Sequence, residues 1–164
     1  NKQNSRGIQM RDKILNLDEM DELAKVLANK YRTGGCIGLI GDLGTGKTTL
    51  TKKICKELHI EENIKSPTFT YVIGYDTGDV KVYHFDVYRI TNEDELYEIG
   101  FEDYMQEEKA LIIVEWANNI LSEMPEDTLY VEIKYNDELS RKVSTYRIEN
   151  GELEYVDIWN NNNN

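Results

Sequence analysis

The stretch that decides the fold runs from Gly41 to Thr48 and has the sequence Gly-Asp-Leu-Gly-Thr-Gly-Lys-Thr. Its glycines let the backbone turn sharply and approach an anion closely. Consecutive backbone N–H groups then point into one concavity, at the positive end of the helix that follows. In this P-loop pattern the lysine reaches the β- and γ-phosphates and the next hydroxyl binds Mg²⁺. We therefore expect Lys47 and Thr48 to bind a nucleoside triphosphate and its metal.

The residues on either side of the loop support that interpretation. The apolar run 36–40 predicts a buried strand before the loop, and apolar spacing predicts a helix from Lys47 to about Leu58. A strand, a glycine-rich loop and a helix in this order are the context in which the pattern is specific. We expect the whole loop and the residue after it to surround the phosphates: Gly41, Asp42, Leu43, Gly44, Thr45, Gly46, Lys47, Thr48 and Thr49.

Further patterns outline the rest of the chain. Apolar residues at steps of three and four predict an amphipathic helix over 18–32, with Asp18 as its N-cap. An acidic helix is expected to begin after Thr91 or Asn92 and to end before Gly100. Five more strands are expected, namely the hairpin pair 68–75 and 80–87, the apolar strand 110–115, and the hairpin pair 129–135 and 143–148.

Strands that alternate with helices, together with two hairpins, indicate an α/β fold. We expect a single P-loop NTPase domain over residues 10–158, with a mixed, mostly parallel sheet flanked by helices and with added β-hairpins. Residues 1–9 show no periodicity and are expected to be a tag or linker. Residues 159–164 end in a run of asparagine and are expected to form a disordered tail.

Composition narrows the function classes. The chain has 164 residues, of which 31 are acidic and 19 basic, so its formal charge is −12. An acidic protein repels a nucleic-acid backbone on average, which disfavours unaided binding of DNA or RNA. The two cysteines, Cys36 and Cys55, are expected to be buried thiols in a reducing compartment. No apolar run approaches the ~20 residues that cross a bilayer, so we expect a cytoplasmic protein with no membrane partner.

Two acidic residues near strand ends are candidates for the metal site. Glu115 ends the strand 110–115, and it can reach Mg²⁺ directly or through water, or orient the attacking water. Asp86 can bind Mg²⁺ or position water, but its spacing fits a surface charge equally well. Arg89 can neutralise charge on the γ-phosphate or make a structural ion pair.

Four segments follow one another at compatible spacing. They are the P-loop with Thr49, then Ser66-Pro67-Thr68-Phe69, then His84-Phe85-Asp86-Val87-Tyr88-Arg89, and finally Val114-Glu115-Trp116. Together they resemble the bacterial TsaE (YjeE) family, the ATPase needed for threonylcarbamoyladenosine modification of tRNA. The resemblance covers residues 17–148. The family often has alanine where Thr45 stands, which is a small departure.

The resemblance implies a compact P-loop α/β domain whose cofactors are ATP and Mg²⁺. It implies that Lys47, Asp86 and Glu115 are the catalytic residues. It also implies that Mg²⁺ is bound by Thr48 and Glu115, with Asp86 as a further candidate ligand.

The same resemblance implies a switch-like loop and protein partners. Ser66 and Thr68 would belong to the switch-like loop, with Thr68 near the γ-phosphate or the metal. Arg89 and Trp116 would lie near the site. The partners would be a TsaB–TsaD type complex, and tRNA would be engaged indirectly through that complex. ATP hydrolysis would reset the complex rather than make the new bond.

Other function classes remain open at this stage. A small-molecule phosphotransferase would use the same P-loop, but it usually needs a lid with several arginines, and none lies between Arg89 and Arg141. A GTPase typically carries Asn-Lys-x-Asp and Asp-x-x-Gly, and neither occurs here. A non-catalytic module would hold nucleotide without turnover. The lysines at 52, 53 and 56 are either a local basic patch or a solvated helix face.

Overall fold

The computed structural model describes residues 12–160, so the predicted tag or linker and residues 161–164 of the predicted tail lie outside the described residues. An eight-stranded sheet has the order β1-β7-β6-β2-β5-β4-β3, with β8 paired to β7. Its strands are β1 (Lys13–Asn16), β2 (Gly35–Ile40), β3 (Val72–Tyr75), β4 (Lys81–Asp86), β5 (Ala110–Glu115), β6 (Leu129–Asp137), β7 (Ser140–Glu149) and β8 (Glu152–Tyr155). The helices are α2 (Leu17–Lys30), α3 (Lys47–Glu57), α4 (Glu93–Glu98), α5 (Phe101–Met105) and the 3₁₀-helix η1 (Ala117–Glu123).

The centre of the sheet is parallel and its margins are antiparallel. β6, β2, β5 and β4 pair in parallel, whereas β3, β7, β1 and β8 join by antiparallel pairing. Parallel strands are covered on both faces, so their sequences are continuous apolar runs rather than alternating ones. Every residue of β5 is buried accordingly. The α/β fold with a mixed sheet, parallel at its centre, is as the sequence predicts.

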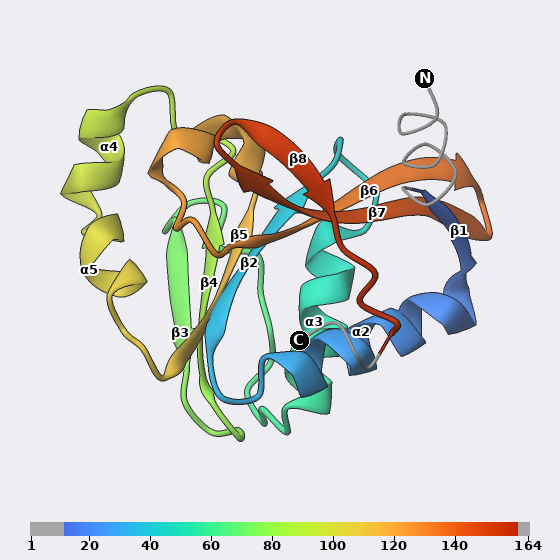
Figure 1. The fold of residues 1–164 in the computed structure, drawn as a ribbon. Coiled ribbons are helices and arrows are strands. Elements are labelled where there is room, and N and C mark those ends of the chain that lie inside the picture. Colours follow the sequence, from blue (N-terminus) through green and yellow to red (C-terminus); the bar gives the residue numbers. More distant parts are fainter. Residues whose placement is uncertain (1–11, 161–164) are drawn as a thin grey trace.

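Helices cover both faces of this sheet (Figure 1). α2 and α3 lie on one face and pack their apolar side chains onto it, with Leu23 and Ile54 fully buried. On the other face, residues of α4, α5 and η1 surround Phe85 of β4, whose ring meets that of Phe101 edge to face with centroids 5.2 Å apart. The two cores fix the sheet between the helices, so that the strand ends have defined positions.

Most of the predicted elements are confirmed, with differences at their ends. α2 is capped by Asn16, not Asp18, because the Asn16 side chain accepts from the N–H of Glu19 while the Glu19 side chain accepts from the N–H of Asn16. The first strand of the first hairpin begins at Val72, because residues 68–71 form a turn. The strands β1 and β8 and the helices α5 and η1 are additions to the sequence-based outline.

Both cysteines are buried and free, as expected, and burial raises the pKa of each thiol to about 12. Trp159, within the predicted tail, packs against the core beside α2. None of the helices among residues 12–160 has the length and apolarity that a membrane span requires.

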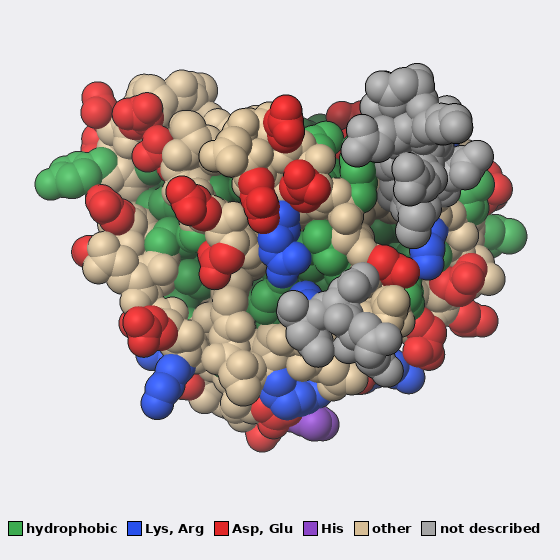
Figure 2. Space-filling model, in the orientation of Figure 1, with side chains coloured by type: hydrophobic (Ala, Val, Ile, Leu, Met, Phe, Trp, Pro, Cys, Tyr) green, Lys and Arg blue, Asp and Glu red, His purple; other side chains and the backbone are tan. Residues whose placement is uncertain are grey.

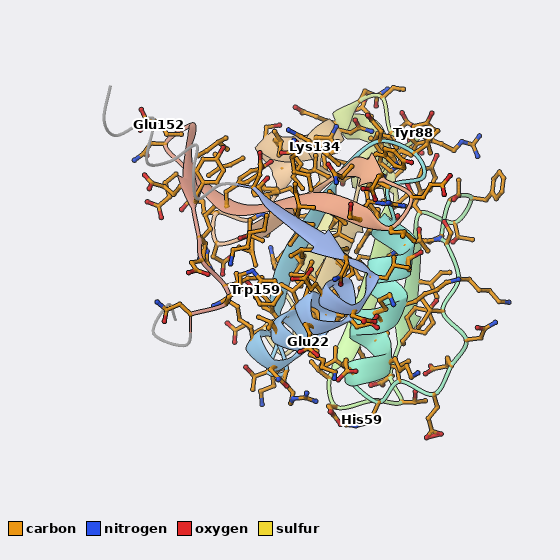
Figure 3. All side chains as sticks on the ribbon, turned by 90° about the vertical axis from the view of Figure 1, so that its right-hand side faces the viewer. Glu22, His59, Tyr88, Lys134, Glu152 and Trp159 are labelled. Atoms are coloured by element: carbon orange, nitrogen blue, oxygen red, sulfur yellow. The ribbon has the colours of Figure 1, made fainter. Side chains whose placement is uncertain are left out.

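The topology brings three chain segments to one edge of the sheet. β2 leads into the P-loop, and in the parallel register Leu39 of β2 and Asp86 of β4 both pair with Glu115 of β5. This edge lies at the N-terminal end of α3, since the helix begins at Lys47 directly after the loop. Figure 3 shows Tyr88 at this end of α3 and His59 at the opposite end. Ligands of open α/β sheets bind at such carboxyl strand ends.

Candidate functional site

The P-loop is held in shape by its glycines and by one arginine. A Cβ atom on Gly41 would lie 2.4 Å from the carbonyl oxygen of Ile133, so only glycine fits there. Gly46 has φ +108°, a backbone conformation that residues other than glycine rarely adopt. The Thr45 hydroxyl donates to the carbonyl of Asp42 at 2.9 Å, and the Arg141 Nε donates to the carbonyl of Thr45 at 3.0 Å. The loop therefore has a defined conformation that its own neighbours maintain.

Lys47 lies within the loop that precedes it. Its Nζ donates to the carbonyls of Gly41 at 2.5 Å and Asp42 at 2.9 Å, and only 5% of the residue is exposed. The ammonium also lies 4.3 Å from the centre of the Trp116 ring, a cation–π geometry. Burial lowers the pKa of Lys47, and the nearby carboxylates, led by Glu115, oppose that shift. The cation is thus placed where backbone carbonyls and an aromatic face substitute for water.

Glu115 receives hydrogen bonds from two elements. The Thr48 hydroxyl at the start of α3 donates to its Oε1 at 2.8 Å and lies 3.0 Å from its Oε2. His84 Nε2 on β4 lies 2.5 Å from the same Oε2. Glu115 is only 2% exposed, and a buried carboxylate needs such partners to offset its lost hydration. The carboxylate is therefore linked directly to the P-loop threonine.

Asp86 is the second buried acid of the site. Its Oδ1 accepts from the Tyr88 N–H at 2.9 Å, and 6% of the residue is exposed. Burial raises the pKa of Asp86 and the charge of Glu115 adds to the shift, while the Tyr88 N–H, His84 and Lys47 act in the opposite direction. Two acids beside one lysine form a charge cluster in which an added cation would be stabilised.

An aromatic pair closes one side of this cluster. The rings of Tyr88 and Trp116 have centroids 4.6 Å apart. Trp116 directly follows Glu115 and has φ +64°, a left-handed conformation that is uncommon for a bulky residue. This backbone turn places the indole ring over the Lys47 ammonium instead of continuing strand β5.

A pocket of about 300 Å³ gathers most of the predicted site residues. The loop after α3 contributes Ser66 and Thr68, whose hydroxyls are 2.8 Å apart. Tyr71 anchors the end of that loop, since its carbonyl accepts from the Asp86 N–H at 3.0 Å. The lining residues are Leu43, Gly44, Gly46, Lys47, Thr48, Thr49, Ser66, Thr68, Asp86, Glu115 and Trp116.

Four predicted site residues lie outside the pocket lining. Gly41, Asp42 and Thr45 form the part of the P-loop behind Lys47. Arg89 is exposed and its guanidinium lies 5.3 Å from the centre of the Phe69 ring.

Three further residues contact the site, and sequence reasoning gave none of them a role, although His84 and Tyr88 occur in the third of the four family segments. His84 contacts Glu115, Tyr88 packs on Trp116, and Arg141 supports the P-loop. Strand alternation could have indicated His84, because it lies two residues before Asp86 and side chains at that spacing point to the same face of a strand. Arg141 offers no such signal, since its contact with Thr45 spans 96 residues.

The donor set suits Mg²⁺. A hydroxyl and two carboxylates supply the oxygen atoms that this hard cation prefers, and they lie beside the lysine expected to contact phosphate. The described residues contain no cluster of three or more histidine, cysteine or acidic side chains arranged to hold a metal alone. Mg²⁺ in nucleotide sites does not need such a cluster, because the protein usually supplies only one or two ligands. Phosphate oxygens and water molecules supply the rest.

This fold and pocket define a protein of the P-loop α/β type. Comparison with solved structures agrees: the crystal structure of Bacillus subtilis YdiB superposes with a TM-score of 0.64 at 30% sequence identity, covering 85% of this chain and 86% of that chain. A family model described as threonylcarbamoyl adenosine biosynthesis protein TsaE matches residues 14–143. The chain therefore belongs to the TsaE family.

Individual relatives agree with this assignment. The tRNA threonylcarbamoyladenosine biosynthesis protein TsaE of Bacillus subtilis is 35% identical over 136 residues, which are 83% of this chain and 84% of that protein. The protein of the same name from Rickettsia felis is 36% identical over 130 residues, 79% of this chain and 75% of its own length. The similarity spans the P-loop and both strand-end acids, since the family match includes residues 41–115.

Proposed function

We propose that this protein binds Mg-ATP in the P-loop pocket and hydrolyses it in support of threonylcarbamoyladenosine modification of tRNA. Membership of the TsaE family supports the pathway. The observation that supports ATP binding and hydrolysis is that one pocket is lined by Lys47, Thr48, Asp86 and Glu115. The protein would work in the cytoplasm, cycling on and off a TsaB–TsaD type complex.

The side chains divide the work of phosphoryl transfer to water. Lys47 exchanges its carbonyl contacts for β- and γ-phosphate oxygens, and backbone N–H groups of the loop donate to the same phosphates. Bound Mg²⁺ would neutralise charge that develops on the phosphates, held by Thr48 and Glu115. Asp86 would orient the attacking water or add a further ligand to Mg²⁺, since its buried carboxylate lines the same pocket. Trp116 covers Lys47 and limits the access of bulk water.

The choice of adenine and of partners rests on the family rather than on the pocket. A P-loop contacts only phosphates, so it does not discriminate between bases. Acidic side chains are spread over the face that Figure 2 shows, and the net charge is −12. Such a surface disfavours direct tRNA binding, which supports contact with tRNA through the partner complex.

The first experiment is Mg²⁺-dependent ATP hydrolysis, measured for the protein alone and with purified TsaB and TsaD. We expect slow turnover alone and faster turnover with the pair. Lys47→Ala should reduce turnover by about 100-fold or more, equivalent to about 3 kcal/mol of transition-state stabilisation. Lys52→Ala is the matched control, because Lys52 is exposed on the same helix.

Each contrary result has a distinct meaning. Turnover that does not depend on Lys47 would contradict the P-loop assignment. Turnover that depends on Lys47 but ignores TsaB and TsaD would contradict the partnership. The alternative function, a small-molecule phosphotransferase using the same P-loop, would then be tested by screening phosphate acceptors.

A further inference from the structure

We propose that His84 is a positioning residue of this site, which holds the Glu115 carboxylate from beneath the pocket in the orientation that Mg-ATP requires. The inference rests on the proposed function, because it concerns how Glu115 is presented to the metal. It assigns a role to a buried histidine that the P-loop pattern does not include.

The contacts of Glu115 are of two kinds. The Thr48 hydroxyl reaches both of its oxygens from the pocket side, and Thr48 itself lines the pocket. Because Thr48 is also a candidate metal ligand, its hydroxyl is shared between Glu115 and any ligand in the pocket. The contact from His84 Nε2 is independent of the ligand, since His84 is fully buried and is not among the pocket-lining residues.

The register of the sheet explains why His84 reaches Glu115. In the pairing of β4 with β5, His84 lies opposite Ile113 and Asp86 lies opposite Glu115. Residues paired in this way point to the same face, and residues two apart on a strand do so as well. His84 is therefore diagonal to Glu115 on the face that α3 covers. Its Nε2 lies 2.5 Å from Glu115 Oε2 as a result.

The hydrogen-bond pattern assigns the tautomer of His84. A carboxylate oxygen only accepts, so Nε2 must carry the proton that it shares with Glu115 Oε2. The other ring nitrogen, Nδ1, is buried and has no hydrogen-bond partner within residues 12–160. A bare acceptor at that position costs less than an unpaired N–H, which favours the form with its proton on Nε2.

The role of His84 follows from the length of the Glu115 side chain. Glutamate has one more rotatable bond than the aspartate that helps to hold Mg²⁺ in many other P-loop proteins, so a metal-facing orientation must be selected from more rotamers. The hydrogen bond from His84 restricts Glu115 to side-chain rotamers in which Oε2 faces Nε2. Partners of this kind behind metal ligands change metal affinity or activity by about 10- to 100-fold when removed.

A pair of variants of equal side-chain length tests this proposal. In His84→Gln the amide nitrogen can stand near the position of Nε2 and donate to Glu115, whereas His84→Met has similar length and no donor. We expect the methionine variant to lose about 10-fold or more in kcat for ATP, with KM within about twofold, and glutamine to restore most of the loss. The Mg²⁺ concentration needed for half-maximal ADP binding, measured by calorimetry, should rise in His84→Met while metal-free ADP affinity stays unchanged.

Two outcomes would overturn the proposal. One is a methionine variant that keeps the parent kcat and Mg²⁺ dependence. The other is equal loss in both variants, because that would show a packing role alone. Neither resembles failure of the proposed function, which would appear as a parent protein that does not bind ADP or hydrolyse ATP.

A measurement on the parent chain keeps the test independent of variant folding. The protein has two histidines, so an NMR spectrum with ¹⁵N-labelled imidazole contains two sets of ring signals. His59→Asn, an exposed site at the far end of α3, identifies the His84 set by elimination. We expect the His84 set to show a protonated Nε2 and a bare Nδ1. A proton on Nδ1 with a bare Nε2 would contradict the donor role of Nε2.

Discussion

The two walls of the pocket are built differently. The buried wall consists of Lys47, Asp86 and Glu115 together with the half-buried Thr48. These side chains contact the P-loop backbone, α3 and neighbouring strands. The open wall consists of Ser66 and Thr68, which bond to each other, and the next residue, Phe69, is 82% exposed. A wall fixed by many contacts suits the binding of phosphate and metal. A wall with few contacts suits a loop that changes conformation in response to the γ-phosphate.

The largest effect is expected in the buried wall. Glu115→Gln removes the charge but keeps the length of the side chain, so ATP turnover should fall by about 100-fold or more. Nucleotide binding without Mg²⁺ should persist, because Lys47 and the loop N–H groups remain. Steady-state kinetics and calorimetry check both statements, with the exposed Glu102→Gln of α5 as control. Turnover within twofold of the parent would remove Glu115 from the metal site.

The open wall should give a smaller effect. Thr68→Ala removes a pocket hydroxyl and is expected to slow turnover by about 10-fold, or roughly 1.4 kcal/mol. Ser66→Ala is the matched control, because it breaks the same Ser66–Thr68 hydrogen bond and leaves the Thr68 hydroxyl in place. Equal loss in the two variants would mean that the loop conformation matters and the Thr68 hydroxyl does not.

Arg141 supports the P-loop from outside the pocket, so its loss should change the free energy of unfolding more than the rate of ATP hydrolysis. Arg141→Met keeps the aliphatic stem but loses the Nε–H bond to the Thr45 carbonyl and the two bonds from the guanidinium to the carbonyls of Asp137 and Ser140. Unfolding should therefore become easier by about 1–2 kcal/mol. Chemical denaturation checks this value, and Lys142→Met next to it controls for loss of a surface charge. An unchanged free energy of unfolding would show that the loop keeps its shape without Arg141.

Burying the charge of Asp86 should lower the stability of the folded protein, and a substitution there can measure by how much. Its pKa is raised in the folded protein, so the folded state takes up a proton more readily than the unfolded chain. The penalty for its charge is therefore fully present above the folded-state pKa and is relieved as the pH falls through that value. Asp86→Asn should raise Tm by a few degrees at most at pH 7, without Mg²⁺ or nucleotide, and the gain should shrink near pH 4. A gain that grows toward acid pH would contradict this sign.

The elements that sequence predicted best are those whose signal is local. The P-loop, α3 and β5 are continuous patterns, and the strand of residues 110–115 has the predicted bounds because all six residues are buried. The N-cap of α2 was wrong because Asn16 and Asp18 can both cap a helix, and only the reciprocal bond with Glu19 decides between them. β1 and β8 are short strands at the margin that exist by pairing with β7, so their own residues carry little signal.

The site divides in the same way. The P-loop pattern predicted Lys47 and Thr48, and the end of the strand 110–115 suggested Glu115. For Asp86 the spacing fitted a surface charge equally well, and only the family resemblance grouped it with the other three. The contact of His84 with Glu115 depends on the β4–β5 register, which sequence does not give. The placement of the Trp116 ring over Lys47 depends on a left-handed turn at Trp116 that its residue type disfavours. Such contacts belong to the tertiary structure alone.

A crystal structure with Mg²⁺ and a non-hydrolysable ATP analogue would show directly whether this pocket binds the triphosphate and its metal. We expect the triphosphate to lie in the pocket and Lys47 Nζ to have moved from the carbonyls of Gly41 and Asp42 to phosphate oxygens. We expect Thr48 and Glu115 to lie at the metal. A triphosphate bound elsewhere on the molecule, or bound in the pocket while Lys47 stays on those carbonyls, would contradict these expectations.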